Sequence, residues 1–101
     1  MRKTENILIV DDNTENLSFL STLLKEEGYD IFPADSGELA LASLEDNIPD
    51  LVLLDIRMPG INGFEVCKRI KQNQNLAEIP VIFLTVATEI NDKLEGFRLG
   101  A

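Results

Sequence analysis

The sequence feature that most constrains the fold is the apolar run at residues 51–54, which is followed by Asp55 and by a turn through Pro59 and Gly60. Four consecutive apolar residues are typical of a strand buried on both faces, as in a parallel sheet covered by helices. A charged residue that ends such a strand needs a function, and in open α/β sheets ligands bind beyond the carboxyl ends of the strands. We therefore expect Asp55 to be the reactive residue of the domain.

Further apolar runs alternate with helical patterns along the chain. We expect strands at residues 7–10, 29–34, 51–54 and 81–85, and helices at residues 14–27, 38–46, 63–72 and from 88 or 89 onward. Alternation of buried strands and amphipathic helices predicts a parallel sheet with right-handed crossovers. Pro33 predicts an edge position for its strand, because proline donates no ladder hydrogen bond. The sequence thus predicts one α/β domain over residues 1–101.

Composition excludes several classes of function. The chain has no histidine, which removes His-based acid–base catalysis and His metal ligands. A net charge of −9 disfavours direct binding of nucleic acid. The longest apolar runs are only four or five residues, so we expect no membrane span and no signal peptide. The one cysteine, Cys67, fits a small core residue in a reducing cytoplasm.

Polar side chains end three of the expected strands: Asp11 and Asp12, then Asp55, then Thr85. Parallel strands place these ends at one edge of the sheet. If the first and third strands are neighbours, three carboxylates lie within a few ångströms and repel one another. Each acid by itself could be a helix cap or a solvated turn residue, but their coincidence favours a site. Mg²⁺ would relieve the repulsion, because it prefers oxygen ligands and binds through one or two carboxylates.

Such a site suits phosphoryl transfer. A carboxylate such as that of Asp55 can attack phosphorus and form an acyl phosphate. The transfer needs positioning and charge neutralisation, which a metal ion and hydrogen-bond donors supply. We expect the Thr85 hydroxyl and the backbone N–H groups of Arg57 and Val86 to be donors. The chain has neither a G-x-G-x-x-G loop nor a Walker lysine, so a dinucleotide-binding or P-loop fold is disfavoured.

Three segments resemble one known family. They are residues 7–12, residues 51–63 with the pattern Asp-x-x-Met-Pro-Gly-x-x-Gly, and residues 80–85. With these segments the chain resembles the receiver domain of two-component response regulators over essentially its whole length. The resemblance implies a flavodoxin-like, CheY-like doubly wound sheet with strand order 2-1-3-4-5. It also implies a switch in the cytoplasm that is controlled by phosphorylation. A histidine kinase or a phosphotransfer protein would donate the phosphoryl group, and an output domain or a target protein would bind the changed surface.

The same resemblance implies a role for each site residue. Asp55 matches the phosphoacceptor. Asp12, Asp55 and the backbone carbonyl of Arg57 match the direct Mg²⁺ ligands, and Asp11 matches the acid that holds a metal-bound water. Thr85 matches the hydroxyl that moves toward the phosphoryl group and couples it to the surface around the fourth helix. Such a domain is not an enzyme beyond slow self-phosphorylation and self-dephosphorylation.

The chain departs from the family pattern at two points. The fifth strand, with its phosphate-pairing lysine, and the fifth helix are missing, and Lys93 does not match that lysine. Val86 is bulkier than the usual residue there, so we expect slower phosphotransfer. The expected strand order is therefore 2-1-3-4. Without the fifth strand, residues 81–84 would form an apolar edge, and without the fifth helix, part of one face of the sheet would be uncovered. We expect either self-association, as a homodimer through that surface, or a longer parent polypeptide.

Three alternatives remain at this point. A pseudo-receiver would keep the fold and no longer take phosphate; the intact acids argue against it and the missing lysine argues for it. A phosphatase of the haloacid dehalogenase type would also use a strand-end aspartate with Mg²⁺, but the position of its second acid is occupied by Arg57. A flavodoxin would need a Ser/Thr/Gly-rich first loop, which this chain lacks.

Overall fold

The computed structural model describes residues 5–84 and contains four strands and three helices in strict alternation. The elements are β1 (Asn6–Val10), α1 (Thr14–Glu26), β2 (Asp30–Ala34), α2 (Gly37–Asp46), β3 (Leu51–Asp55), α3 (Gly63–Gln72) and β4 (Val81–Leu84). The predicted strands and helices in this range are confirmed to within a few residues at each end. Thr85, Val86, Lys93 and the helix expected from residue 88 or 89 lie outside the described residues.

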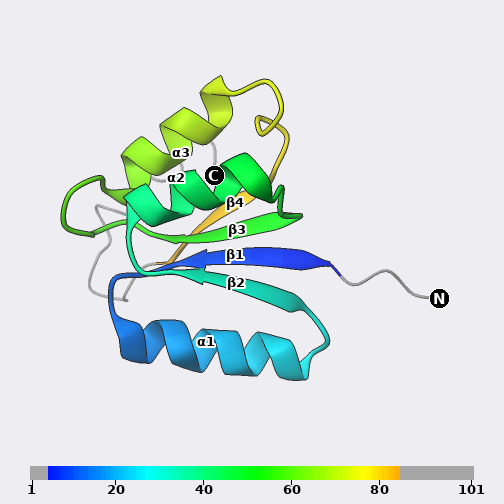
Figure 1. Cartoon of the computed structure of the whole chain (residues 1–101). Helices are drawn as coiled ribbons and strands as arrows, with labels where there is room; N and C mark the ends of the chain where they lie inside the picture. Colours follow the sequence, from blue (N-terminus) through cyan, green and yellow to red (C-terminus); the bar gives the residue numbers. More distant parts are fainter. Residues whose placement is uncertain (1–4, 85–101) are drawn as a thin grey trace.

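The strands form one parallel sheet in the order β2-β1-β3-β4. This is the predicted order, and it leaves β2 at one edge of the sheet. Pro33 is tolerated there, because an edge strand can lack one backbone N–H without losing a ladder hydrogen bond. α1 covers one face of the sheet, and α2 and α3 cover the other (Figure 1). The chain is therefore a doubly wound α/β domain, in which the carboxyl ends of all four strands lie on the same edge.

Side-chain caps decide where the helices begin. The Asn13 carboxamide oxygen accepts from the backbone N–H groups of Glu15 and Asn16, at 3.0 and 3.1 Å. The Ser36 hydroxyl and the Asn62 carboxamide cap α2 and α3 in the same way. Each cap satisfies N–H groups that have no partner inside the helix. The first helical residues of all three helices are thereby placed next to the carboxyl edge of the sheet.

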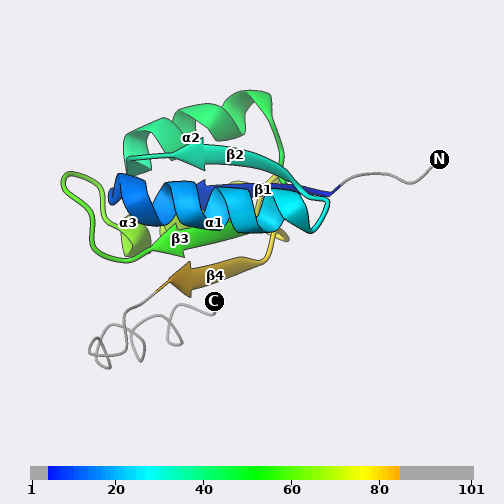
Figure 2. The ribbon, with the colours of Figure 1, turned by 90° about the horizontal axis from the view of Figure 1, so that it is seen from below.

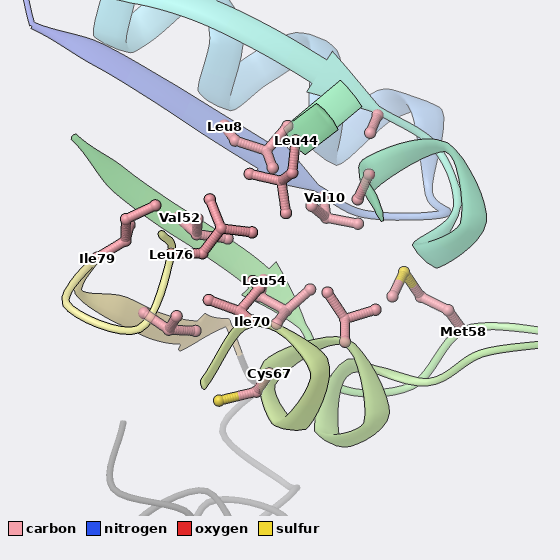
Figure 3. Close-up of a cluster of buried hydrophobic side chains, with 14 residues drawn as sticks. Leu8, Val10, Leu44, Val52, Leu54, Met58, Cys67, Ile70, Leu76 and Ile79 are labelled. Carbon is pink, nitrogen blue, oxygen red and sulfur yellow. The ribbon is translucent and has the colours of Figure 1, made fainter. Parts of the chain in front are cut away.

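The larger core lies between the sheet and the α2/α3 layer (Figure 3). Leu8 and Val10 of β1 and Val52 and Leu54 of β3 are fully buried there. Cys67 of α3 is buried in the same cluster, which confirms its interpretation as a small core residue. These alternate residues of each strand share one face because successive side chains of a strand point to opposite sides.

The opposite face is only partly covered. α1 packs against β1 and β2, and β4 lies outside the area that α1 covers (Figure 2). Ile82 of β4 is 51% exposed, and on α1 Phe19 is 67% and Leu23 is 44% exposed. The helical spacing of the leucines in α1 favours a buried position for Leu23, but the structure leaves it exposed. Among the described residues, an apolar surface thus remains open on the α1 side.

Candidate functional site

β1 and β3 are neighbours in the sheet, which was the condition on which the predicted acidic cluster depended. Val10 pairs with Leu54, so the residues that follow them, Asp11 and Asp55, reach the carboxyl edge side by side. Asp12 comes next along the first loop. Two segments 44 residues apart in sequence therefore supply the acids of one site.

The carboxylates of Asp11, Asp12 and Asp55 each offer an oxygen within 4.8 Å of the other two. Asp11 is only 5% exposed, Asp55 is half-buried and Asp12 is exposed. The cluster therefore has a buried base and a side open to solvent. Such a set of hard oxygen donors at close range is chemically suited to a divalent cation.

The environment of Asp55 disfavours its charge. Partial burial, the charge of Asp11 and a hydrogen bond with the Asp12 carboxyl raise the pKa of Asp55 to about 7, from the ordinary 3.8. The Arg57 backbone N–H donates to the Asp55 carboxylate and lowers this pKa in part. Without a cation, the Asp55 carboxyl is thus partly protonated near neutral pH. Strong pKa perturbation at a strand end is typical of functional sites.

Asp11 is held by the start of α1 as well as by its burial. The Asn13 backbone N–H donates to Asp11 Oδ1 at 2.9 Å, and the Asp11 N–H donates to the carbonyl of Ala34, the last residue of β2, at 3.1 Å. Asn13 in turn caps α1 through its own side chain. The buried acid at the base of the cluster therefore has a fixed orientation.

The loop between β3 and α3, residues 56–62, holds the other side of the site. The Gly63 N–H donates to the Ile56 carbonyl at 2.8 Å and closes the loop at its base. Ile56 and Met58 are buried and anchor the segment between them. Arg57 lies between these anchors, where its N–H meets Asp55 and where the resemblance predicts a carbonyl ligand for the metal.

Sequence reasoning missed two features of this loop. A Cβ at Gly63 would collide with the Asp55 backbone carbonyl, so α3 begins in direct contact with the end of β3. Glu38, at the start of α2, contacts the tip of the loop through the Ile61 N–H. The closely spaced glycines 60 and 63 were the available signal. Of the predicted site residues, Thr85 and Val86 lie outside the described part of the chain.

The fold and the site together define a class: a doubly wound α/β domain with a cluster of three aspartates at the carboxyl edge of its sheet. Comparison with known proteins makes the class specific. A sequence model of the response regulator receiver domain matches residues 7–101. The chain belongs to this family, the receiver domains of two-component systems.

Curated relatives are similar over nearly the whole chain. Response regulator PleD of Caulobacter vibrioides is 38% identical over 95 residues, which is 94% of this chain and 21% of PleD. The alkaline phosphatase synthesis transcriptional regulatory protein PhoP of Bacillus subtilis is 39% identical over 97 residues, 96% of this chain and 40% of PhoP. The chain thus spans less than half the length of these relatives.

Solved structures agree on the fold. A putative response regulator from Chloroflexus aurantiacus superposes with a TM-score of 0.93 at 37% identity, covering 98% of this chain and 81% of that one. The chemotaxis response regulator CheY4 of Vibrio cholerae gives a TM-score of 0.89 at 30% identity, covering 98% and 82%. The predicted CheY-like fold is therefore confirmed. None of the three described helices has the length and hydropathy that a membrane-spanning segment requires.

Proposed function

We propose that this chain is a single phosphoacceptor domain, in which Asp55 accepts a phosphoryl group from a histidine kinase or a phosphotransfer protein in a Mg²⁺-dependent reaction. The observation that carries the proposal is the convergence of Asp11, Asp12 and Asp55 within 4.8 Å at the carboxyl edge of the sheet. Three acids this close would repel one another as a purely structural arrangement. A bound divalent cation would remove this repulsion, because carboxylate oxygens are the ligands that such ions prefer.

In this proposal Asp12, Asp55 and the Arg57 carbonyl hold Mg²⁺ directly, and Asp11 holds a water molecule of its coordination shell. Bound Mg²⁺ would neutralise the carboxylates and the charge on the transferred phosphoryl oxygens. The buried, hydrogen-bonded state of Asp11 supports its role as an orienting group rather than the acceptor. Asp55, half-buried and beside the solvent-exposed Asp12, is the more accessible acid.

The transfer itself makes one bond and breaks one. A carboxylate oxygen of Asp55 forms a P–O bond, while the P–N bond of the donor phosphohistidine breaks and the imidazole nitrogen keeps the electron pair and takes up a proton. The Arg57 N–H, which already donates to Asp55, is placed to donate to the transferred group. Thr85 and the Val86 N–H are proposed as the remaining donors, and Val86 as a cause of slow transfer.

The output of the proposed switch is a change in the surface around the fourth helix, read by an output domain or a target protein. The domain turns over no substrate beyond slow gain and loss of its own phosphoryl group. A cytoplasmic location suits a phosphorylated donor and the buried thiol of Cys67. The output and the cognate kinase are properties of a whole response regulator. The chain covers only 21% of the length of PleD and 40% of the length of PhoP.

Intact-mass spectrometry after incubation with acetyl phosphate and Mg²⁺ tests this proposal. We expect an adduct of one phosphoryl group that is lost when a chelator replaces Mg²⁺ and is absent from the Asp55→Asn variant. Asp46→Asn, at the exposed end of α2, is the matched control and should form the adduct.

Two outcomes would contradict the proposal. Absence of an adduct in the unmodified protein would favour the pseudo-receiver, a binding domain that no longer takes phosphate. Continuous hydrolysis of a generic phosphomonoester would favour the aspartate-nucleophile phosphatase instead, although Arg57 occupies the position of its second acid.

We also propose that the chain associates with a second copy through β4 and the open apolar surface on the α1 side. The exposed side chains of Ile82, Phe19 and Leu23 support this, because exposed apolar side chains favour association. Sedimentation or light scattering should give a concentration-dependent mass, and Ile82→Lys should shift it toward the monomer. A constant monomer mass up to high protein concentration would contradict it.

A further inference from the structure

The loop of residues 56–62 carries the Arg57 N–H that donates to Asp55, so the position of the loop affects the geometry of the site. Its base is fixed by the Gly63–Ile56 hydrogen bond and by the buried side chains of Ile56 and Met58. Its tip, at Gly60 and Ile61, extends away from these anchors. What holds the tip lies on another element.

The tip rests on the first turn of α2. Glu38 Oε2 accepts from the Ile61 backbone N–H at 3.4 Å, across 23 residues of sequence. A Cβ at Gly60, which has φ +75°, would lie 2.6 Å from the same oxygen. A Cβ at Gly37 would lie 2.7 Å from the Ile61 carbonyl oxygen. Glycine at both positions therefore permits a close approach of the two backbones, with the Glu38 carboxylate between them.

We propose that Glu38 is a positioning residue, which holds the tip of the 56–62 loop against α2 and thereby positions Arg57, whose backbone N–H donates to Asp55. The expected effect on Mg²⁺ binding and phosphorylation rests on the proposed function, whereas the contact of Glu38 with Ile61 is independent of that function. Glu38 acts on the site indirectly, through the backbone of the loop, because only Met58, Pro59 and Gly60 separate Ile61 from Arg57.

An alternative role for Glu38 is purely structural. An acid in the first turn of a helix stabilises it through the helix dipole, regardless of what the carboxylate oxygen contacts. The two roles need different properties of the side chain. The dipole needs the charge, whereas the contact with Ile61 needs the reach of the side chain and an acceptor oxygen. Two conservative variants separate them.

Glu38→Asp keeps the charge and shortens the side chain, and Glu38→Gln keeps the length and an oxygen acceptor and removes the charge. We expect Glu38→Asp to speed amide hydrogen exchange at Ile61 and to weaken Mg²⁺ binding, each by about three- to tenfold, as for the loss of one hydrogen bond. Glu38→Gln keeps a neutral acceptor within reach of Ile61, so both quantities should change less than in Glu38→Asp. Glu45→Asp, exposed at the other end of α2, is the control and should change neither quantity.

The readouts are amide exchange by NMR, Mg²⁺ affinity by calorimetry, and the rate of adduct formation with acetyl phosphate. Unchanged exchange and Mg²⁺ affinity in Glu38→Asp would overturn the inference, as would a loss in Glu38→Gln that Glu38→Asp does not share. If the unmodified protein bound no Mg²⁺ and took no phosphate, the proposed function would fail. The exchange rate of Ile61 would still decide whether Glu38 holds the loop.

Discussion

Asp55 combines two requirements that conflict in an apo protein. In its proposed role as a nucleophile it must be ionised, yet partial burial, the charge of Asp11 and the hydrogen bond with Asp12 raise its pKa to about 7. The conflict is resolved if a cation binds the same oxygens, because a nearby positive charge favours the ionised carboxylate. The repulsion among the three carboxylates would thus favour the binding of Mg²⁺, because the ion would relieve it.

The raised pKa gives a prediction for stability against pH in the absence of Mg²⁺. Between about pH 4 and 7 the folded protein keeps the Asp55 proton that the unfolded chain has lost, so the free energy of unfolding falls as the pH rises through this window. Asp55→Asn cannot ionise and avoids this loss. Its advantage should grow from near zero at pH 4 to about 1 kcal/mol above pH 7, a figure reduced for solvent screening of a half-exposed group. Urea unfolding at several pH values measures it, and an advantage that is constant with pH would contradict it.

At the scale of elements, the junction of β3 and α3 matters more than either element alone. Gly63 is the first residue of α3 and lies against the Asp55 backbone carbonyl, so α3 begins where β3 ends. The N-cap of Asn62 and the Gly63–Ile56 hydrogen bond hold the same junction. A shift of α3 would therefore move Asp55 directly.

Gly63→Ala tests this junction. Alanine gains up to about 1 kcal/mol over glycine from helix propensity, but the collision with the Asp55 carbonyl should cost about 1–3 kcal/mol as overpacking. We expect net destabilisation together with weaker Mg²⁺ binding, measured by chemical unfolding and calorimetry.

The control for that variant is Gly28→Ala. Gly28 has φ +98° and no neighbour within 4 Å of a Cβ, so alanine there strains the backbone without touching the site. It should lose stability and keep the Mg²⁺ affinity of the unmodified protein. Equal losses of Mg²⁺ affinity in both variants would show that general destabilisation, and not the junction, is responsible.

At the scale of the whole molecule, the acidic site connects the two halves of the sheet. Asp11 and Asp12 follow β1, which pairs with β2, and Asp55 is the last residue of β3, which pairs with β4. Any ligand that binds all three acids therefore favours the folded sheet over the unfolded chain, in which nothing holds Asp55 close to Asp11 and Asp12.

Mg²⁺ should accordingly stabilise the protein against heat. At a concentration of one hundred times its dissociation constant, the gain is about 2.7 kcal/mol. For a domain of this size each kcal/mol raises Tm by about 4–8 °C. Asp12→Asn should largely remove the shift, measured by calorimetry at two protein concentrations to separate it from self-association. An equal shift in Asp12→Asn would contradict a Mg²⁺ site at this cluster.

Local patterns in the sequence were sufficient for the elements and for the candidate residues. The apolar run before Asp55 predicted a buried strand, the helical pattern from residue 14 predicted α1, and Pro33 predicted an edge strand, because each depends on properties of neighbouring residues. The acids could be named for the same reason: each directly follows an apolar run. The family resemblance supplied the strand order and the roles.

Only the tertiary structure decided the distances. Whether Asp11 and Asp12 meet Asp55 depends on β1 and β3 lying side by side, which follows from how the whole chain crosses the sheet. The raised pKa of Asp55 exists only once burial and those neighbours are in place. The contact of Glu38 with Ile61 likewise joins two helices' starting segments that no local pattern connects. Local sequence sets the conformation of a segment, whereas the energy of a site depends on separations that only the folded chain has.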